Sequence, residues 1–291
     1  YIPFQNIVLK LTGVVILISS IGFYLNGSME LLTAIIMMLM SFIVFSVLET
    51  MGAYSALLRV VDMCVERAKE TLSIEPMDIS GEEYITKTDN IEISSVDFAY
   101  DKKKIIDNVS LIIPEKTTVA FVGPSGGGKT TLCHLIARFW DVDKGMISLD
   151  EKNVKDYSMD SLMQNFSFVF QNVYLFHDTI ANNIRFGQPN TPMDDVIMAA
   201  KKACCHDFII ALPDGYNTVI GENGASLSGG EKQRISIARA IMKDAPIIIL
   251  DEATANVDPE NERDLMEAIQ ELTKEKTVLM IAHRLKTVRK A

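Results

Sequence analysis

The sequence predicts a mixed α/β domain that follows two membrane-spanning helices. Hydrophobic residues make up 48% of the 291-residue chain, and they concentrate in two uncharged apolar runs at its start. Beyond residue 90, short apolar segments alternate with helical stretches, an order typical of a parallel sheet covered by helices. Two glycine-rich segments, at residues 123–130 and 227–231, each stand directly before a helical stretch.

The two apolar runs, residues 11–25 and 31–48, contain no charged side chain, and neither has a polar face. Each comes close to the length, about 20 residues, that a helix needs to cross the hydrocarbon core of a bilayer. A turn signal, Asn26-Gly27-Ser28, separates them. We therefore expect a transmembrane hairpin with helices at about 5–25 and 31–50, and a pair of buried core helices is the alternative.

The charge distribution orients this hairpin. The turn carries only Glu30, whereas Arg59, Arg67 and Lys69 follow the second run. Because positive residues accumulate on the cytoplasmic side, we expect everything after about residue 50 to lie in the cytoplasm. Charged residues enter at helical spacing up to about residue 72, so the second helix is predicted to continue beyond the bilayer.

The bulk composition opposes several classes of function. A formal net charge of −10 argues against a surface built mainly for nucleic acid, which needs clustered lysine and arginine. The four cysteines have no spacing typical of a zinc site or a redox pair. The chain starts at Tyr1, inside an apolar run, and stops at Ala291, shortly after a predicted strand, so we expect a fragment of a longer protein.

Three sections are expected along the chain. Residues 1–72 are the C-terminal part of a membrane domain with its cytoplasmic extension, and the polar residues 73–90 are a linker. Residues 91–291 are the α/β domain, which we expect to be truncated at its C-terminus.

The α/β domain is predicted to begin with antiparallel structure. Alternating apolar residues at 91–98 and 109–113 predict two half-buried strands. Continuous apolar runs predict buried parallel strands at residues 119–122, 247–250 and 278–281. The helices predicted between them include residues 194–211 and 231–243.

The first glycine-rich segment reads Gly-Pro-Ser-Gly-Gly-Gly-Lys-Thr and follows a predicted strand. This pattern is typical of a loop whose backbone N–H groups surround phosphate oxygens at the start of a helix. Lys129 is expected to reach the β- and γ-phosphates of a nucleotide, and the Thr130 hydroxyl to ligate Mg²⁺. The predicted nucleotide-binding residues of this segment are Gly123, Pro124, Ser125, Gly126, Gly127, Gly128, Lys129, Thr130 and Thr131.

Two adjacent carboxylates, Asp251 and Glu252, end the predicted strand at 247–250. A strand end beside a phosphate loop is where a metal-organising carboxylate belongs. We expect Asp251 to hold Mg²⁺ through water, and Glu252 to orient and polarise the water that attacks the γ-phosphate. A solvated pair of turn carboxylates is the alternative.

The second glycine-rich segment consists of Leu227, Ser228, Gly229, Gly230 and Glu231. Its serine is a good N-cap, and its glycines expose N–H groups at the start of a helix. With the phosphate loop, Gln171, Asp251-Glu252 and His283 in this order, the chain resembles the ATP-binding cassette (ABC) transporters, specifically exporter-type half-transporters with fused membrane and ATPase domains. The resemblance covers essentially the whole chain. It implies a P-loop NTPase fold of the α/β class with an antiparallel β subdomain and a helical subdomain.

The resemblance also assigns roles to single residues. Tyr100 matches the aromatic residue that stacks on adenine, and Gln171 matches the glutamine that senses Mg²⁺ and the attacking water. His283 matches the histidine that contacts the γ-phosphate, and Asp258 matches the aspartate of a loop that communicates across a dimer. Residues 221–224 match a segment that couples to the membrane helices. Without the resemblance, Tyr100 is a surface aromatic of an edge strand and His283 is an ordinary polar residue at a strand end.

The mechanism that the resemblance implies needs two copies of the ATPase domain packed head to tail. ATP and Mg²⁺ bind between them, and residues 227–231 of one copy face the phosphate loop of the other. The expected partners are a second half-transporter, identical or different, the lipid bilayer and a transported substrate of unknown identity, with no nucleic acid.

The function implied is transport across a membrane, expected to be a bacterial plasma membrane, driven by ATP hydrolysis in a cytoplasmic domain. Two alternatives stay open. One is a soluble ABC ATPase that acts on nucleic acid or ribosomes. The other is a regulatory ATP-binding subunit of a heterodimeric transporter, and a siderophore importer with the exporter fold is also compatible.

Overall fold

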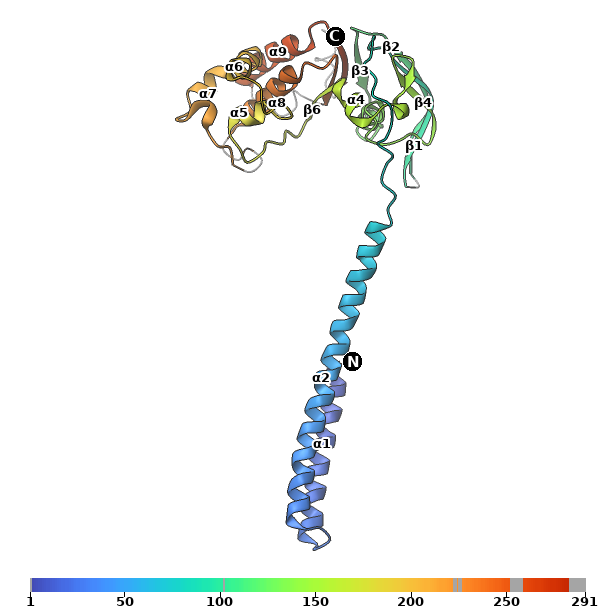
Figure 1. Cartoon of the computed structure of the whole chain (residues 1–291), viewed down its shortest axis with the longest axis vertical. Coiled ribbons are helices and arrows are strands. Elements are labelled where there is room, and N and C mark those ends of the chain that lie inside the picture. The colour runs from blue at the N-terminus through green and yellow to red at the C-terminus, as the bar shows by residue number, and fades with distance from the viewer. Residues whose placement is uncertain (1, 102, 222–223, 225–226, 252–258, 283–291) are drawn as a thin grey trace. The chain divides into compact units, whose positions relative to one another are not determined.

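The computed structural model describes residues 2–101, 103–221, 224, 227–251 and 259–282 of the chain (Figure 1). The chain divides into two compact units, Tyr1–Pro76 and Met77–Ala291. The boundary falls shortly after the long second helix, within the section predicted to be a linker.

The first unit consists of two helices, α1 (Ile2–Leu25) and α2 (Leu31–Leu72), which pack along each other (Figure 1). Most of their described apolar side chains are exposed; Leu11 and Leu39, for example, are 60% and 58% exposed. Among the described residues, Leu31–Leu48 is long and apolar enough to cross a membrane, and Lys10–Leu25 is a shorter apolar helix. Helix α2 ends at Leu72, where the charge pattern predicts the end of the cytoplasmic extension.

The second unit begins with an antiparallel sheet in the strand order β2-β1-β4-β5. Its strands are β1 (Ile91–Tyr100), β2 (Lys103–Ile113), β4 (Lys144–Leu149) and β5 (Lys152–Asn153). Ile91 and Ile93 are 1% exposed and Glu92 between them is exposed, which confirms the alternation predicted for this strand. Strand β4 has no such alternation, because three exposed residues precede three buried ones, so no alternating pattern marks it in the sequence.

The other sheet is parallel and has the order β3-β8-β7-β6. Its strands are β3 (Thr118–Val122), β6 (Phe166–Val169), β7 (Ile247–Asp251) and β8 (Thr277–Ala282). Four consecutive residues of β7, from Ile247 to Leu250, are buried. Their continuous apolar run is explained by burial on both faces of the sheet.

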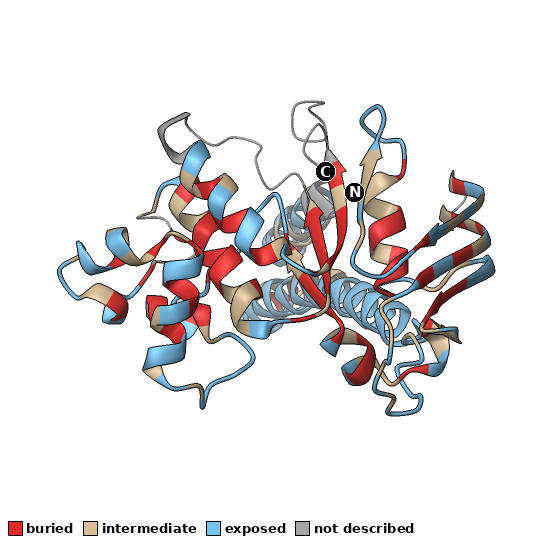
Figure 2. Ribbon diagram, turned by 90° about the horizontal axis from the view of Figure 1, so that it is seen from above, coloured by how far each residue is buried: buried red, intermediate tan, exposed pale blue. Residues whose placement is uncertain are grey.

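The helices of this unit lie around the parallel sheet, and α5 to α9 gather on the side away from the antiparallel sheet (Figure 1). Figure 2 shows the buried residues concentrated in the parallel strands and on the inner faces of the helices. The helices are α3 (Lys129–Ile136), α4 (Met159–Gln164), α5 (Ile180–Ile184), α6 (Met193–Lys202), α7 (His206–Ile210), α8 (Gly229–Lys243) and α9 (Pro259–Thr273), with short 3₁₀ turns η1 (Val154–Asp156) and η2 (Gly215–Asn217).

The single helix predicted over residues 194–211 is wrong in one respect, because the structure divides it into α6 and α7. Cys204 has a φ of 52°, and the Cys205 N–H donates to the Ala200 carbonyl at 2.9 Å. This left-handed residue with its backward hydrogen bond is a common way to end a helix. The sequence has no glycine or proline at this point, so the break had no local signal.

The structure also differs from the predicted linker of residues 73–90. Residues from Met77 onward belong to the second unit. Glu82 forms an isolated parallel bridge with Tyr157, and the Tyr84 ring packs edge-on against the Tyr157 ring at 5.4 Å. Tyr157 is more than seventy residues away from Glu82 and Tyr84 in the sequence. A polar segment held by such distant contacts therefore has the sequence pattern of a linker.

Candidate nucleotide-binding site

The predicted phosphate loop connects the end of β3 to the start of α3. Gly126 and Gly128 have φ of 78° and 81°, in the left-handed region that favours glycine. Gly128 is the N-cap of α3 and offers no side-chain acceptor to the first N–H groups of the helix. A helix start of this kind leaves those N–H groups available to an anion.

The lysine of this loop lies over the loop itself. The Lys129 ammonium donates hydrogen bonds to the carbonyls of Gly123 and Pro124, at 3.0 and 2.9 Å. Thr130 and Thr131 are partly exposed in the first turn of α3, while residues 123–127 are exposed. Positive charge, free N–H groups and two hydroxyls therefore meet at one end of α3.

Asp251 lies at the same edge of the parallel sheet as the phosphate loop. In the ladder it pairs with Ile281, and the next residue, Ala282, pairs with Val122 at the end of β3. Because the carboxyl ends of parallel strands share one edge, the two features are brought together.

The Asp251 charge also influences the pKa values of two α3 residues. Burial raises the pKa of the Cys133 thiol, and the negative charge of Asp251 raises it further. Burial lowers the pKa of His134, and the Asp251 charge acts in the opposite direction. The Asp251 carboxylate is therefore close enough to α3 to act electrostatically on residues just behind the loop.

Gln171 is exposed and follows β6, the strand that pairs with β7 on its far side. Val169 pairs with Leu250, so the chain leaves β6 at the edge where Asp251 ends β7. The adjacent Phe170 carbonyl accepts a hydrogen bond from the Gln233 amide at 3.3 Å, which ties this segment to α8. Glu252, Asp258 and His283 lie outside the described residues.

The residues at this edge suit Mg²⁺ bound together with phosphate. The Thr130 hydroxyl, the Asp251 carboxylate and the Gln171 amide offer oxygen atoms, which are the ligands that Mg²⁺ prefers. In the described part of the chain, no group of three His, Cys, Asp or Glu residues could hold a metal ion by itself. A site with one or two protein ligands fits an ion that is also coordinated by nucleotide phosphates.

Tyr100 ends β1 within a group of three aromatic rings. Its ring centroid lies 4.9 Å from that of Phe98 and 5.5 Å from that of Trp140, both in edge-on geometry. The sequence singled out Tyr100 alone. Trp140, which follows α3 and is 51% exposed, belongs to no motif, so nothing in the sequence indicated it.

The second glycine-rich segment starts α8. The Ser228 side chain accepts from the Glu231 N–H at 3.3 Å, and the Glu231 carboxylate accepts from the Ser228 N–H at 2.8 Å, which is a complete capping box. Ser228 and Gly229 are exposed, and Leu227 packs partly buried against the core under the helices. Helix α8 packs on β6, which is separated from β3 by two strands of the parallel sheet.

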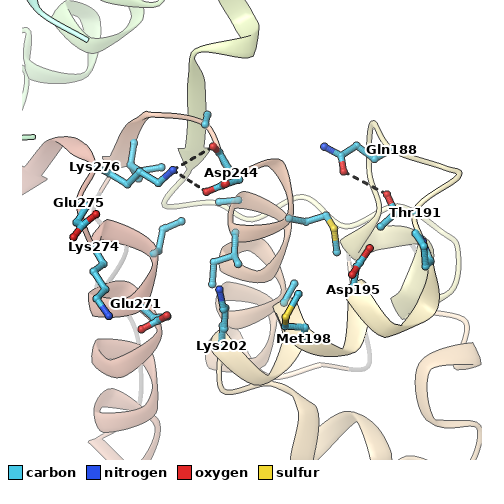
Figure 3. A pocket seen from close by; sticks show the side chains of 18 residues that line it. Gln188, Thr191, Asp195, Met198, Lys202, Asp244, Glu271, Lys274, Glu275 and Lys276 are labelled. Carbon is cyan, nitrogen blue, oxygen red and sulfur yellow. Dashed lines mark hydrogen bonds and ion pairs between the residues drawn. The ribbon is translucent and has the colours of Figure 1, made fainter. Parts of the chain in front are cut away.

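A separate pocket of about 760 Å³ lies among α6, the end of α8 and the end of α9 (Figure 3). Both positively charged lysines and negatively charged carboxylates line it. Lys276 forms an ion pair with Asp244 at 2.7 Å. None of the predicted site residues lines this pocket, so it is distinct from the candidate nucleotide site.

The residues described above combine a phosphate loop, a strand-end carboxylate and a capped glycine-rich helix start, which together define an ABC-type ATPase. The model of the ABC transporter family matches residues 106–255, about half of the chain, and the chain belongs to this family. The fold class and the family expected from the sequence are thereby confirmed.

Two individual members of the family show which kind of transporter the chain is similar to. The chain is 51% identical over 204 residues to the ATP-dependent lipid A-core flippase of Syntrophus aciditrophicus (strain SB), which covers 70% of this chain and 34% of that protein. It is 43% identical over 244 residues to the ATP-dependent lipid A-core flippase of Haemophilus influenzae (strain 86-028NP), which covers 83% of this chain and 40% of that protein.

A solved structure of a bacterial Atm1-family ABC exporter with ATP bound is similar at a TM-score of 0.71 and 31% identity. The match covers 99% of this chain and 51% of that chain. The chain thus spans between about a third and a half of the length of the proteins it matches. Both units, including α1 and α2, have counterparts in an exporter.

Proposed function

We propose that this chain is part of an exporter-type transporter that couples ATP hydrolysis to movement of a substrate across a membrane. One observation carries the proposal. The unit β3–phosphate loop–α3 shares a sheet edge with Asp251, in a chain that also has an apolar helix long enough to span a bilayer.

Each residue of the edge has a defined task in this proposal. The N–H groups of residues 125–130 and the Lys129 ammonium bind the phosphates of ATP. Thr130, Asp251 and Gln171 hold Mg²⁺, which neutralises charge on the β- and γ-phosphates when it is bound. Glu252 follows Asp251 directly in sequence and orients the attacking water.

The adenine and the γ-phosphate receive further contacts. Tyr100 stacks on the adenine ring, and His283 contacts the γ-phosphate. Asp258 takes part in communication between two ATPase domains. Trp140 lies beside Tyr100 and is half exposed, which supports the stacking of Tyr100 on adenine.

A second copy of the domain, from an identical or related half-transporter, completes the site. Leu227, Ser228, Gly229, Gly230 and Glu231 act on the ATP of the partner. The exposure of Ser228 and Gly229 supports this role, as does the packing of α8 on β6, which two strands separate from β3. Loss of the γ-phosphate on hydrolysis then releases the contact that holds the two domains together.

The membrane part and the cargo follow from the family. Helix α1 and the apolar part of α2 lie in the membrane, expected to be a bacterial plasma membrane, and the rest of α2 and the ATPase domain lie in the cytoplasm. We propose an amphiphilic lipid as the cargo class, because relatives at 43–51% identity are named lipid A-core flippases. A soluble ATPase for nucleic acid is opposed by the exposed apolar faces of α1 and α2 and by the net charge of −10.

The experiment that tests the proposal is Mg²⁺-dependent ATP hydrolysis by the complete protein in lipid vesicles. Replacing a general base or water-orienting group typically costs about 10²–10⁴ in rate, so Glu252→Gln is expected to lose turnover by this factor and to retain ATP binding. Lys144→Ala, at an exposed lysine of β4, is the control and should behave as wild type. Near-normal hydrolysis by Glu252→Gln would contradict the assignment.

A further inference from the structure

Arg138 lies directly beyond the end of the phosphate-loop helix α3. Its φ is 54°, in the left-handed region where glycine is the usual residue. The Arg138 N–H donates to the Leu135 carbonyl at 3.0 Å, and the Phe139 N–H donates to the His134 carbonyl at 2.8 Å. The helix therefore ends in the common left-handed motif, but with an arginine where that motif favours glycine. Cys204 and Asp244 end α6 and α8 with a positive φ as well, so what distinguishes Arg138 is the set of contacts that its side chain makes.

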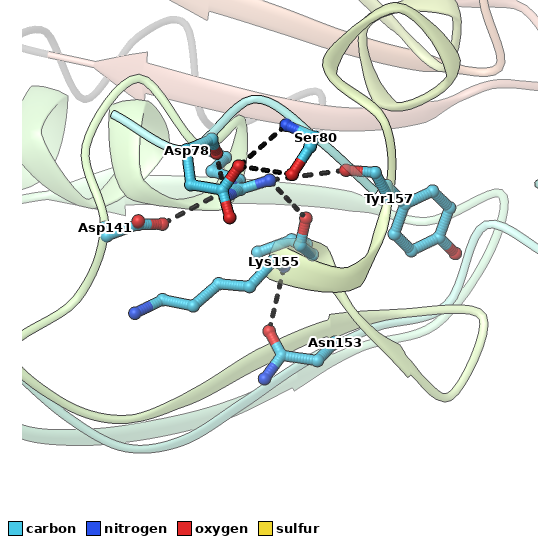
Figure 4. Close-up of polar contacts among 8 residues, drawn as sticks. Asp78, Ser80, Asp141, Asn153, Lys155 and Tyr157 are labelled. Atoms are coloured by element: carbon cyan, nitrogen blue, oxygen red, sulfur yellow. Dashed lines mark hydrogen bonds and ion pairs between the residues drawn. The ribbon is translucent and has the colours of Figure 1, made fainter. Parts of the chain in front are cut away.

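The side chain of Arg138 is 3% exposed, and three of its nitrogens make polar contacts. Figure 4 labels its partners Asp78, Asp141 and Tyr157. Its Nε forms an ion pair with Asp141 at 3.1 Å. Its Nη1 donates to the Tyr157 carbonyl at 3.3 Å, and its Nη2 donates to the Asp78 carbonyl at 2.6 Å. Only a planar guanidinium presents donors in this spread geometry, and the single nitrogen of lysine does not.

The Asp78 carbonyl belongs to a segment that we call the strap, residues 78–88. The Glu82 N–H donates to the Asp156 carbonyl and the Ser158 N–H donates to the Glu82 carbonyl, both at 2.9 Å. The Tyr84 hydroxyl donates to Asp150 at 2.9 Å. These bonds hold the strap on the second unit along its length.

Gly81 shows how closely the strap approaches the domain. A Cβ atom at this position would stand 2.3 Å from the Tyr157 carbonyl oxygen and 2.7 Å from the Ser158 nitrogen. Both are backbone atoms that cannot move aside as a flexible side chain could. The strap therefore keeps its place only while residue 81 has no side chain.

The strap and the membrane helix are joined by a very short piece of chain. Helix α2 ends at Leu72, and residues 73–77 are all that separates it from Asp78. At its other end, the bond to Asp78 comes from the arginine that terminates α3, whose first turn carries Lys129 and Thr130. One helix thus connects the phosphate loop to the segment that leads into α2.

We propose that Arg138 is a positioning residue that transmits nucleotide-dependent movement of α3 to the strap and thereby to α2. This inference rests on the proposed function and adds a route of coupling to it. The guanidinium fixes the strap to the end of the helix that ATP contacts at its start. A displacement of α3 then displaces Asp78 directly, because the Arg138 guanidinium bonds to the Asp78 carbonyl, and residues 73–77 carry the displacement on towards α2.

The test uses the complete protein in lipid vesicles and three measurements. These are ATP affinity with a fluorescent ATP analogue, basal ATP hydrolysis, and the spectrum of a nitroxide label on Cys64, with other reactive cysteines replaced by serine. Cys64 is exposed on α2, beyond the apolar stretch that ends at Leu48, so a label there reports on this helix. The label is compared between nucleotide-free protein and protein held with ATP and vanadate.

Three variants separate coupling from folding. Arg138→Gly removes the side chain and suits the left-handed backbone, and Arg138→Lys keeps the charge without the spread donors. Gly81→Ala dislodges the strap and leaves the arginine intact, so it decides the matter if both Arg138 variants misfold. Tyr84→Phe is the matched control, because it removes the strap bond to Asp150, which does not involve α3.

We expect the Arg138 variants and Gly81→Ala to keep ATP affinity and basal hydrolysis within about twofold, and to lose more than about half of the ATP-dependent change at Cys64. Tyr84→Phe should keep that change. The inference would be overturned if Arg138→Gly and Gly81→Ala, or Arg138→Lys, kept the full ATP-dependent change at Cys64. It would also be overturned if Tyr84→Phe lost as much of that change as the Arg138 variants. A wild-type protein that hydrolyses no ATP would instead overturn the proposed function, and the inference with it.

Discussion

The left-handed glycines of the phosphate loop give a prediction with a built-in control. Gly126 and Gly128 have nearly the same φ, 78° and 81°. A Cβ at Gly126 would meet no atom within 4 Å, whereas a Cβ at Gly128 would stand 2.9 Å from the Ile106 Cδ1 and 3.3 Å from the Ile105 carbonyl oxygen. The two alanine variants therefore share the backbone cost and differ in the packing cost.

The magnitudes follow from these two terms. Placing a residue with a Cβ in the left-handed region costs about 1–2 kcal/mol, which is the whole expected effect of Gly126→Ala. Overpacking a buried site adds about 1–3 kcal/mol, so Gly128→Ala is expected to lose about 2–5 kcal/mol. Ile106 is only 5% exposed, and the Ile105 carbonyl is part of β2, so neither can move away freely.

The assay is urea unfolding of the chain in detergent, followed by fluorescence. Trp140 is the only tryptophan of the chain, and it lies beside Tyr100 in the second unit, so its signal reports on the domain that carries the loop. Equal destabilisation by the two variants would refute the reasoning, because it would mean that β2 does not support the phosphate loop at Gly128.

Three further predictions concern the second unit and α2. Tyr100→Ala should weaken ATP binding by about 1–3 kcal/mol while Tyr100→Phe retains it, and titration calorimetry that shows no difference between them and wild type would remove the stacking role. The pKa of Asp150 is lowered, first by a hydrogen bond from the Lys87 N–H and then by strap hydroxyls. Its stabilisation is therefore complete above the ordinary aspartate pKa and is lost as the pH falls through the lowered value, so the unfolding free energies of wild type and Asp150→Asn should converge in acid. Burial raises the pKa of Cys205 to about 12, so maleimide should modify the exposed Cys64 in the folded protein and Cys205 only after unfolding, as mass spectrometry can check.

The parts of the fold that the sequence predicted have a local cause. The β7 run is continuous because both faces of a parallel strand are buried, and the β1 alternation reflects one buried face. The phosphate loop can be recognised in the sequence because its conformation requires glycine at positions 126 and 128. Asp251 can be recognised as a site residue because it directly follows an apolar strand segment. In each case the physical requirement falls on neighbouring residues, so it leaves a pattern.

The features that the sequence did not predict depend on contacts between distant residues. Cys204 ends α6 in the left-handed conformation without glycine, and Arg138 does the same for α3, each at a position that tertiary structure imposes. The strap looks like a polar linker because its partners, such as Asp150 and Tyr157, are more than sixty residues away. Trp140 lies forty residues after Tyr100, so the two rings meet only in the folded domain.

The central claim, that hydrolysis of ATP at this site drives transport, is tested most directly by lipid translocation in vesicles that contain the complete protein. The assay measures how fast a fluorescently labelled phospholipid becomes protected from an external reductant after addition of Mg²⁺ and ATP. We predict translocation by wild type that requires ATP, and none above the protein-free level by Glu252→Gln, although this variant binds ATP. Translocation at the same rate by both proteins, or by wild type without ATP, would contradict the claim.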